Sequence, residues 1–147
     1  MTTCHRGPMP ARPIPVPDER SVGFWDAARA GRLATQRCAR CGFLTYPPVP
    51  VCSRCHADPP AFEWADVSGR GRLATWTIVR DAFLPGFAEI TPYVVGEVEL
   101  VEQPGLRFVA RVVGIDHEAL RPGMSLRVDF VDGGDGTRVP VFVEAEP

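Results

Sequence analysis

Two short cysteine motifs decide how the chain is interpreted: Cys38-Ala-Arg-Cys41-Gly42 and, with ten residues between Cys41 and Cys52, Cys52-Ser-Arg-Cys55-His56. A gap of two residues lets both thiolates of one tight turn face the same ion, and a second such turn completes four tetrahedral ligands. Gly42 suits the left-handed backbone that such a turn usually needs. Because four thiolates leave no open position for a substrate, we expect a closed site that holds the fold and does no chemistry.

We interpret the site as structural Zn²⁺ held by Cys38, Cys41, Cys52 and Cys55, with His56 as a reserve ligand at best. Iron in a rubredoxin-like site would use the same thiolates, and the sequence alone does not separate it from zinc. Disulfides would need an oxidising compartment, and residues 1–17 lack the apolar core of a signal peptide.

Composition limits the other possibilities. The 147 residues are enough for one domain or for two small modules that share a core, and 45% of them are hydrophobic. No apolar run approaches the length of about 18 residues that a membrane span requires, so we expect a soluble, cytoplasmic protein. All sixteen basic residues are arginine, which excludes a mechanism that needs a Schiff-base lysine.

Charge is divided unevenly along the chain. Residues 1–80 contain eleven arginines against six acidic residues, whereas residues 81–147 contain five against twelve. The basic half contains the cysteine motifs and could attract phosphates, but a solvated arginine-rich face is an equally simple interpretation.

Residues 1–17 are predicted to form an extended arm, because alternate prolines prevent regular pairing. Cys4 and His5 lie in this arm and are given no role. Residues 18–65 should form a helix over 21–30, capped by Ser21 and ended by Gly31, followed by the metal ribbon and a linker over 56–65.

Residues 66–147 should form an OB-fold, because five segments alternate with period two and a helical turn over 116–120 separates the third from the fourth. The expected strands are 71–80, 93–101, 106–112, 124–130 and 139–143. In the first, one face should hold Leu73, Thr75, Thr77 and Val79. A five-stranded sandwich or open sheet is the main alternative.

The loop over 81–91 carries Phe83, Leu84, Phe87 and Ile90, although connecting loops are normally polar. It should either fold back over the barrel end or contact a partner or acyl chain. No catalytic constellation emerges, since the histidines are scattered and no serine lies in a nucleophile-elbow context. We therefore expect no chemistry from this chain alone.

A series of short motifs resembles one known family. These motifs, in chain order, are Phe24-Trp25-Asp26, Gly31-Arg-Leu33, Gln36-Arg-Cys38, Cys41-Gly42, Tyr46-Pro47-Pro48, Cys52-x-x-Cys55, Ser68-Gly69-x-Gly71, Pro92-Tyr93-Val94 and Val139-Pro140-Val141-Phe142. The chain resembles, over residues 14–143, the small proteins with an N-terminal helix, a rubredoxin-like zinc ribbon and a C-terminal OB-fold. Members of that family accompany thiolases, thiolase-like aldolases of steroid side-chain degradation and related acyl-CoA enzymes.

The resemblance implies a non-catalytic accessory subunit that docks on a thiolase-like enzyme as a hetero-oligomer and helps to shape its acyl-CoA entrance. It carries the zinc ligands over to the four cysteines. The candidate partner or acyl-CoA contacts are aromatic or apolar: Phe24, Trp25, Tyr46, Phe83, Leu84 and Phe87.

Two other functions stay open. Zinc ribbons and OB-folds commonly bind single-stranded nucleic acid, and Phe62, Trp64 and Trp76 would then form a stacking groove. The acidic OB-fold half argues against that reading, because such a module should carry a basic footprint there. An independent acyl-CoA hydrolase or synthase is the third possibility.

Overall fold

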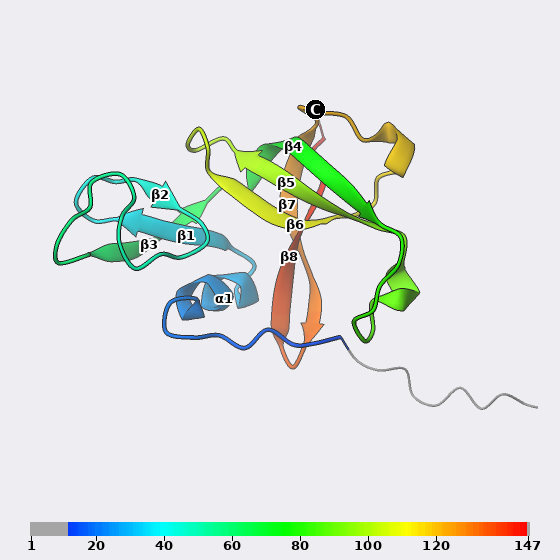
Figure 1. Cartoon of the computed structure of the whole chain (residues 1–147), viewed down its shortest axis with the longest axis horizontal. Coiled ribbons are helices and arrows are strands. Elements are labelled where there is room, and N and C mark those ends of the chain that lie inside the picture. The colour runs from blue at the N-terminus through cyan, green and yellow to red at the C-terminus, as the bar shows by residue number, and fades with distance from the viewer. Residues whose placement is uncertain (1–11, 147) are drawn as a thin grey trace, which may run out of the picture.

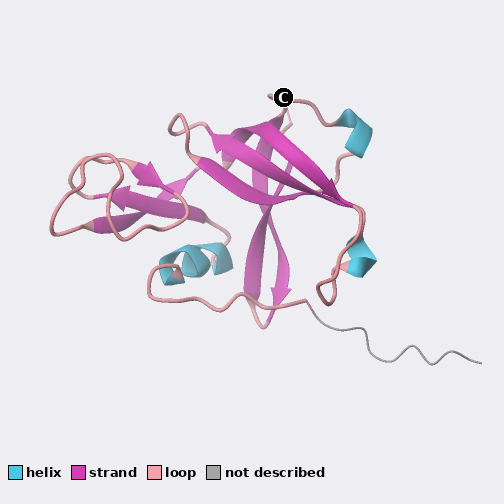
Figure 2. Ribbon diagram, viewed as in Figure 1, coloured by secondary structure: helices cyan, strands magenta, loops and turns pink. Residues whose placement is uncertain are grey.

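The computed structural model describes residues 12–146 and is mainly β (Figures 1 and 2). The elements run in the order α1 (Val22–Arg29), β1 (Leu33–Cys38), β2 (Leu44–Thr45), β3 (Phe62–Val67), β4 (Arg70–Val79), η1 (Ala88–Ile90), β5 (Tyr93–Leu100), β6 (Arg107–Val112), η2 (His117–Ala119), β7 (Ser125–Gly134) and β8 (Thr137–Glu144). The ribbon strands β1 to β3 lie to one side of the barrel, and α1 lies between the two beside β8. Cys4 and His5 of the predicted arm fall outside the described residues.

Helix α1 agrees with the prediction within one residue at each end. Ser21 occupies the N-cap position, but its side chain makes no capping hydrogen bond to the helix. Its hydroxyl donates instead to the Asp18 carboxylate, which also accepts the Ser21 N–H at 2.8 Å. Gly31 follows the helix with φ +75°, a left-handed conformation that glycine adopts without steric cost.

The ribbon sheet has the order β2-β1-β3, and it corrects the expected linker over residues 56–65. Phe62–Val67 forms β3, which pairs antiparallel with β1 from Leu33↔Val67 to Cys38↔Phe62. β1 is buried at five of its six positions, so it lacks the alternation that identifies a half-exposed strand. Because the sequence of β1 does not alternate, it does not predict a strand there, and the pairing of residues 62–67 with β1 was therefore not predicted.

The barrel is closed with the strand order β4-β5-β6-β8-β7, which confirms the five-stranded OB-fold and excludes the sandwich. β6 and β8 pair in parallel, and β4 pairs with β7 to complete the closure. η2 lies between the third and fourth barrel strands, as the sequence predicted.

The faces of two barrel strands differ from their predicted alternation. In β4 the register shifts between Leu73 and Thr75, so Leu73 is buried but Trp76 and Ile78 then pack against the core. The single predicted face through Val79 is therefore wrong beyond Leu73, because a bulge changes the phase of every later side chain. In β8 both Val141 and Phe142 are buried, Phe142 in the barrel core.

The interior of the barrel is packed closely around Gly96 of β5. A Cβ atom there would lie 2.7 Å from Val112 Cγ2 and 2.9 Å from Leu73 Cδ1. Glycine is therefore required at this position by the close approach of core side chains.

Ribbon, helix and barrel share one hydrophobic core, to which Phe24 and Leu33 contribute from outside the barrel. The rings of Tyr46 and Phe108 stack with centroids 3.7 Å apart, and Phe24 lies 5.5 Å from Tyr46 and 6.4 Å from Phe108. Gln103 adds a polar clamp: its amide accepts the Leu44 N–H and donates to the Leu44 carbonyl, each at 2.9 Å. Among residues 12–146, no helix has the length and apolar character needed to cross a bilayer.

Candidate functional site

The four predicted cysteine ligands converge on one point at the end of the ribbon. All four Sγ atoms lie within 4.8 Å of one another, with 3.6 Å between Cys38 and Cys55 and 3.7 Å between Cys41 and Cys52. Ligands about 2.3 Å from a tetrahedral ion lie about 3.8 Å from one another, and disulfide sulfurs would lie about 2.05 Å apart. The donor set therefore fits a tetrahedral metal ion and does not fit disulfides.

Two equivalent turns produce this geometry. The N–H of Gly42 donates to the Cys38 carbonyl at 2.8 Å, and the N–H of His56 donates to the Cys52 carbonyl at 3.0 Å. In each motif the residue that follows the second cysteine has a positive φ, +74° at Gly42 and +49° at His56. His56 is exposed and lies outside the group of candidate ligands. We infer that His56 serves the turn through its backbone.

The environment of the four thiols favours ionisation of some and opposes that of another. The Cys55 N–H lowers the pKa of Cys52 to about 6, and the Cys41 N–H lowers the pKa of Cys38. Although the Ala57 N–H favours the Cys55 thiolate, burial and the three other sulfurs together raise the pKa of Cys55 to about 12. Four neighbouring thiols cannot all ionise without compensation, and a divalent metal supplies that compensation.

Four of the six predicted contact residues meet at a second feature, a cavity of about 510 Å³. Phe24, Trp25, Tyr46 and Phe87 all contribute to its wall. The rest of the wall comes from residues 12–15, β6 and the two strands of the β7–β8 hairpin. Phe24 is mainly a core residue, because its exposed fraction is only 4%.

The apolar loop over 81–91 packs against the barrel at one residue and is exposed at two others, and its contact with a partner or acyl chain stays a prediction. Phe87 packs on Tyr93 with ring centroids 5.9 Å apart and lies under the Arg12 guanidinium. Phe83 and Leu84 instead project outward, with exposed fractions of 95% and 51%. The loop thus folds back at Phe87 and presents an apolar tip at Phe83 and Leu84.

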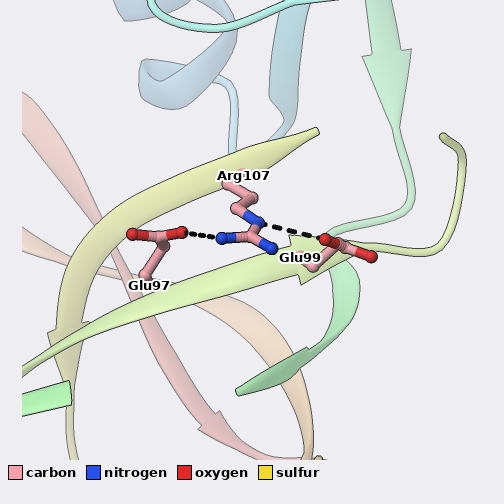
Figure 3. A network of polar contacts seen from close by, with 3 residues as sticks. All are labelled: Glu97, Glu99 and Arg107. Carbon is pink, nitrogen blue, oxygen red and sulfur yellow. Dashed lines mark hydrogen bonds and ion pairs between the residues drawn. The ribbon is translucent and has the colours of Figure 1, made fainter. Parts of the chain in front are cut away.

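The outer face of β5 and β6 beside the ribbon carries paired charges (Figure 3). Arg107 of β6 donates from Nη1 to Glu97 at 2.6 Å and from Nε to Glu99 at 3.0 Å. The two carboxylates raise the pKa of Arg107. This face is therefore not a simple basic surface.

The sequence did not identify several residues of the cavity wall. Arg12 lies in the proline-rich segment, and Arg111 reads as one more outward residue of an alternating strand. Gly133, in the hairpin, reads only as part of a turn. No local pattern marks these residues, because the cavity is formed by segments that are far apart in sequence.

Fold and site together define a protein with a four-cysteine metal ribbon joined to an OB-fold. Two family models match it: the one described as ChsH2, rubredoxin-like zinc ribbon domain, over residues 25–63, and the one described as ChsH2, C-terminal OB-fold domain, over residues 64–131. The chain belongs to this ChsH2/DUF35 family, as the sequence motifs predicted.

Three relatives have sequences similar to this chain. The probable enoyl-CoA hydratase alpha subunit of Thermomonospora curvata is 33% identical over 95% of this chain, but the chain spans only 42% of that relative. A DUF35 domain-containing scaffold protein of Methanocaldococcus jannaschii is 32% identical over 68% of this chain and 71% of its own length. Benzoylsuccinyl-CoA thiolase subunit BbsA of Thauera aromatica is 34% identical over 58% of this chain and 55% of its own length.

A solved structure extends the similarity to nearly the whole fold. One chain of the Ltp2-ChsH2(DUF35) aldolase is 31% identical, with a TM-score of 0.79 over 90% of this chain and 99% of that one.

Proposed function

We propose that this chain is a non-catalytic scaffold subunit of a thiolase-like acyl-CoA enzyme, either a thiolase or an aldolase that cleaves a steroid side chain. One observation carries the proposal: the fold matches, almost from end to end, one chain of the Ltp2-ChsH2(DUF35) aldolase. The relatives described as a scaffold protein and as a thiolase subunit support it. The partner would supply catalysis, and this chain would help to shape the acyl-CoA entrance.

The exposed tip of the β4–β5 loop supports a docking role. Phe83 and Leu84 are apolar and stand away from the core, and Phe87 anchors the loop beneath them. Exposed apolar groups of this kind usually mark an interaction surface, and aromatic residues are enriched at the centres of such surfaces. We assign Phe83 and Leu84 to the partner contact.

The metal is proposed to be Zn²⁺ with a structural role. Four thiolates in tetrahedral geometry suit zinc, and a closed site leaves no position for a substrate. The ligands must stay reduced, which supports a cytoplasmic location. We also propose the units 18–65 for helix plus ribbon and 66–147 for the OB-fold, with β3 of the ribbon sheet running two residues past that boundary. Metal analysis of the purified chain checks the assignment, which requires one zinc per chain and would be overturned by iron.

Reconstitution tests the scaffold role. The thiolase-like enzyme encoded nearest to this chain is expressed with and without it, and acyl-CoA turnover and soluble yield are compared. We expect the partner to lose activity or solubility alone and to recover when the chain is added. The Phe83→Ser variant should weaken the recovery, whereas a matched exposed change, Val101→Ser, should not. Full partner activity without the chain would refute the proposal.

The nucleic-acid alternative gains no support from the positions of its aromatic residues. Trp76 packs against the barrel core, and the Trp64 indole lies directly against Gly23 of α1. Arg107, on the strand face that OB-folds use for oligonucleotides, is paired with two carboxylates.

A further inference from the structure

The cavity beside α1 has the size and lining of a small-molecule site. Its volume of about 510 Å³ lies within the range of about 300–1,000 Å³ that is usual for ligand pockets. Four aromatic residues contribute to its wall, Phe24, Trp25, Tyr46 and Phe87, together with a few charged groups. Ligand pockets typically combine a mainly apolar wall with a small number of placed polar groups.

The cavity also lies where OB-folds bind their ligands. Val109, Ala110 and Arg111 line it from β6, Phe87 from the β4–β5 loop, and residues 131–134 from the β7–β8 hairpin. These are the strand face and the two loops through which OB-folds contact ligands. An otherwise open binding face is thus converted into a pocket.

Residues 12–15 close the pocket from the other side. The Nε of Arg12 donates to the Gly86 carbonyl at 3.1 Å, and its guanidinium lies 5.9 Å from the Phe87 ring centroid. Ile14 lies beside Gly134, where an added Cβ would be 3.4 Å from Ile14 Cδ1. This segment therefore connects the loop to the hairpin across the binding face.

Arg111 gives the pocket a charge preference. Its Nε is buried and has no hydrogen-bond partner, and no carboxylate of residues 12–146 forms an ion pair with it. Burial lowers the pKa of Arg111, and the nearby Arg12 charge lowers it further. Asp132 is the acidic residue of the wall, and its Oδ1 accepts the Gly134 N–H at 2.8 Å. Two arginines thus face one carboxylate.

Arg111 lines the cavity and has no ion pair among residues 12–146, so an anion bound in the cavity would compensate its charge. A carboxylate suits this role, because the planar guanidinium matches its two oxygens. The aromatic wall would cover the apolar remainder of such a molecule.

We propose that this cavity binds a small organic carboxylate, with its apolar or aromatic body against Trp25 and Phe87 and its carboxylate on Arg111. The inference rests on the isolated chain and does not require the scaffold role.

Titration of the full-length chain with three isosteric probes tests the proposal: 4-phenylbutyrate, 4-phenylbutanol and 4-phenylbutylamine. We expect saturable 1:1 binding of the carboxylate, at least about tenfold tighter than binding of the alcohol or the amine, as a hydrogen bond to a charged group implies. Arg111→Gln should abolish that preference. Arg127→Gln removes the same charge from an exposed position of β7 outside the wall and should leave it unchanged.

The indole N–H signals of the three tryptophans give a second readout that needs no change at Arg111. Carboxylate binding should shift the Trp25 signal most, and Trp25→Phe assigns that signal. Three results would overturn the proposal: no saturable binding, equal affinity for all three probes, or a shift confined to Trp64 or Trp76. Absence of binding would indicate that the cavity accepts a protein segment and not a small molecule.

Discussion

Replacing Gln103 with alanine should loosen the attachment of the ribbon to the barrel. The Gln103 amide makes two hydrogen bonds of 2.9 Å to the backbone of Leu44, and in this way completes the pairing of the short strand β2. Each hydrogen bond contributes about 0.5–1.5 kcal/mol net, so the loss of both should cost about 1–3 kcal/mol. For a chain of this size, a cost of about 2 kcal/mol lowers Tm by about 4–8 °C.

Thermal and urea unfolding measure this cost, and amide hydrogen exchange localises it. The Leu44 N–H should exchange faster in Gln103→Ala, whereas the barrel strands change little. Glu102→Gln is the matched control, because glutamine keeps an acceptor for the Ser68 N–H that Glu102 now binds. That neighbouring variant should stay within about 0.5 kcal/mol of wild type. If Gln103→Ala were equally mild, or if exchange at Leu44 did not change, the clamp would have no energetic role.

Three further variants test the site and the packing. Cys38→Ser should lose the metal and unfold the ribbon, because structural zinc contributes folding free energy directly. His56→Gly should keep one metal per chain. Equal metal loss in both variants would make His56 a ligand. Gly96→Val should destabilise the barrel by about 1–3 kcal/mol in urea unfolding, because a Cβ at this position would lie 2.7 and 2.9 Å from core atoms. An unchanged unfolding midpoint would contradict that packing. Phe83→Ser combined with Leu84→Ser should leave Tm within about 1–2 °C of wild type, since both side chains are exposed. The double variant should weaken partner binding at least tenfold, as measured by calorimetry. Undiminished affinity would place the contact elsewhere.

The metal site and the barrel could be predicted from sequence because each has a local signature. The spacing of Cys38, Cys41, Cys52 and Cys55 is sufficient to bring four thiolates together, and period-two alternation identified all five barrel strands. The β3 strand was missed because its partner β1 is buried at nearly every position.

The cavity could not have been predicted in the same way. Arg111 becomes unusual only when Arg12 and the β7–β8 hairpin are placed against β6, and such long-range proximity leaves no spacing pattern. The prediction of which β4 side chains share a face was wrong for a related reason. A bulge after Leu73 changes which side chains point inward, and nothing in an alternating sequence marks where the register shifts.

The scaffold role is tested most directly by native mass spectrometry of the tagged chain after co-expression with the thiolase-like enzyme encoded nearest to it. We expect a stable hetero-oligomer whose mass includes both proteins and one zinc for each copy of this chain. A zinc-loaded chain that elutes without the enzyme would contradict it.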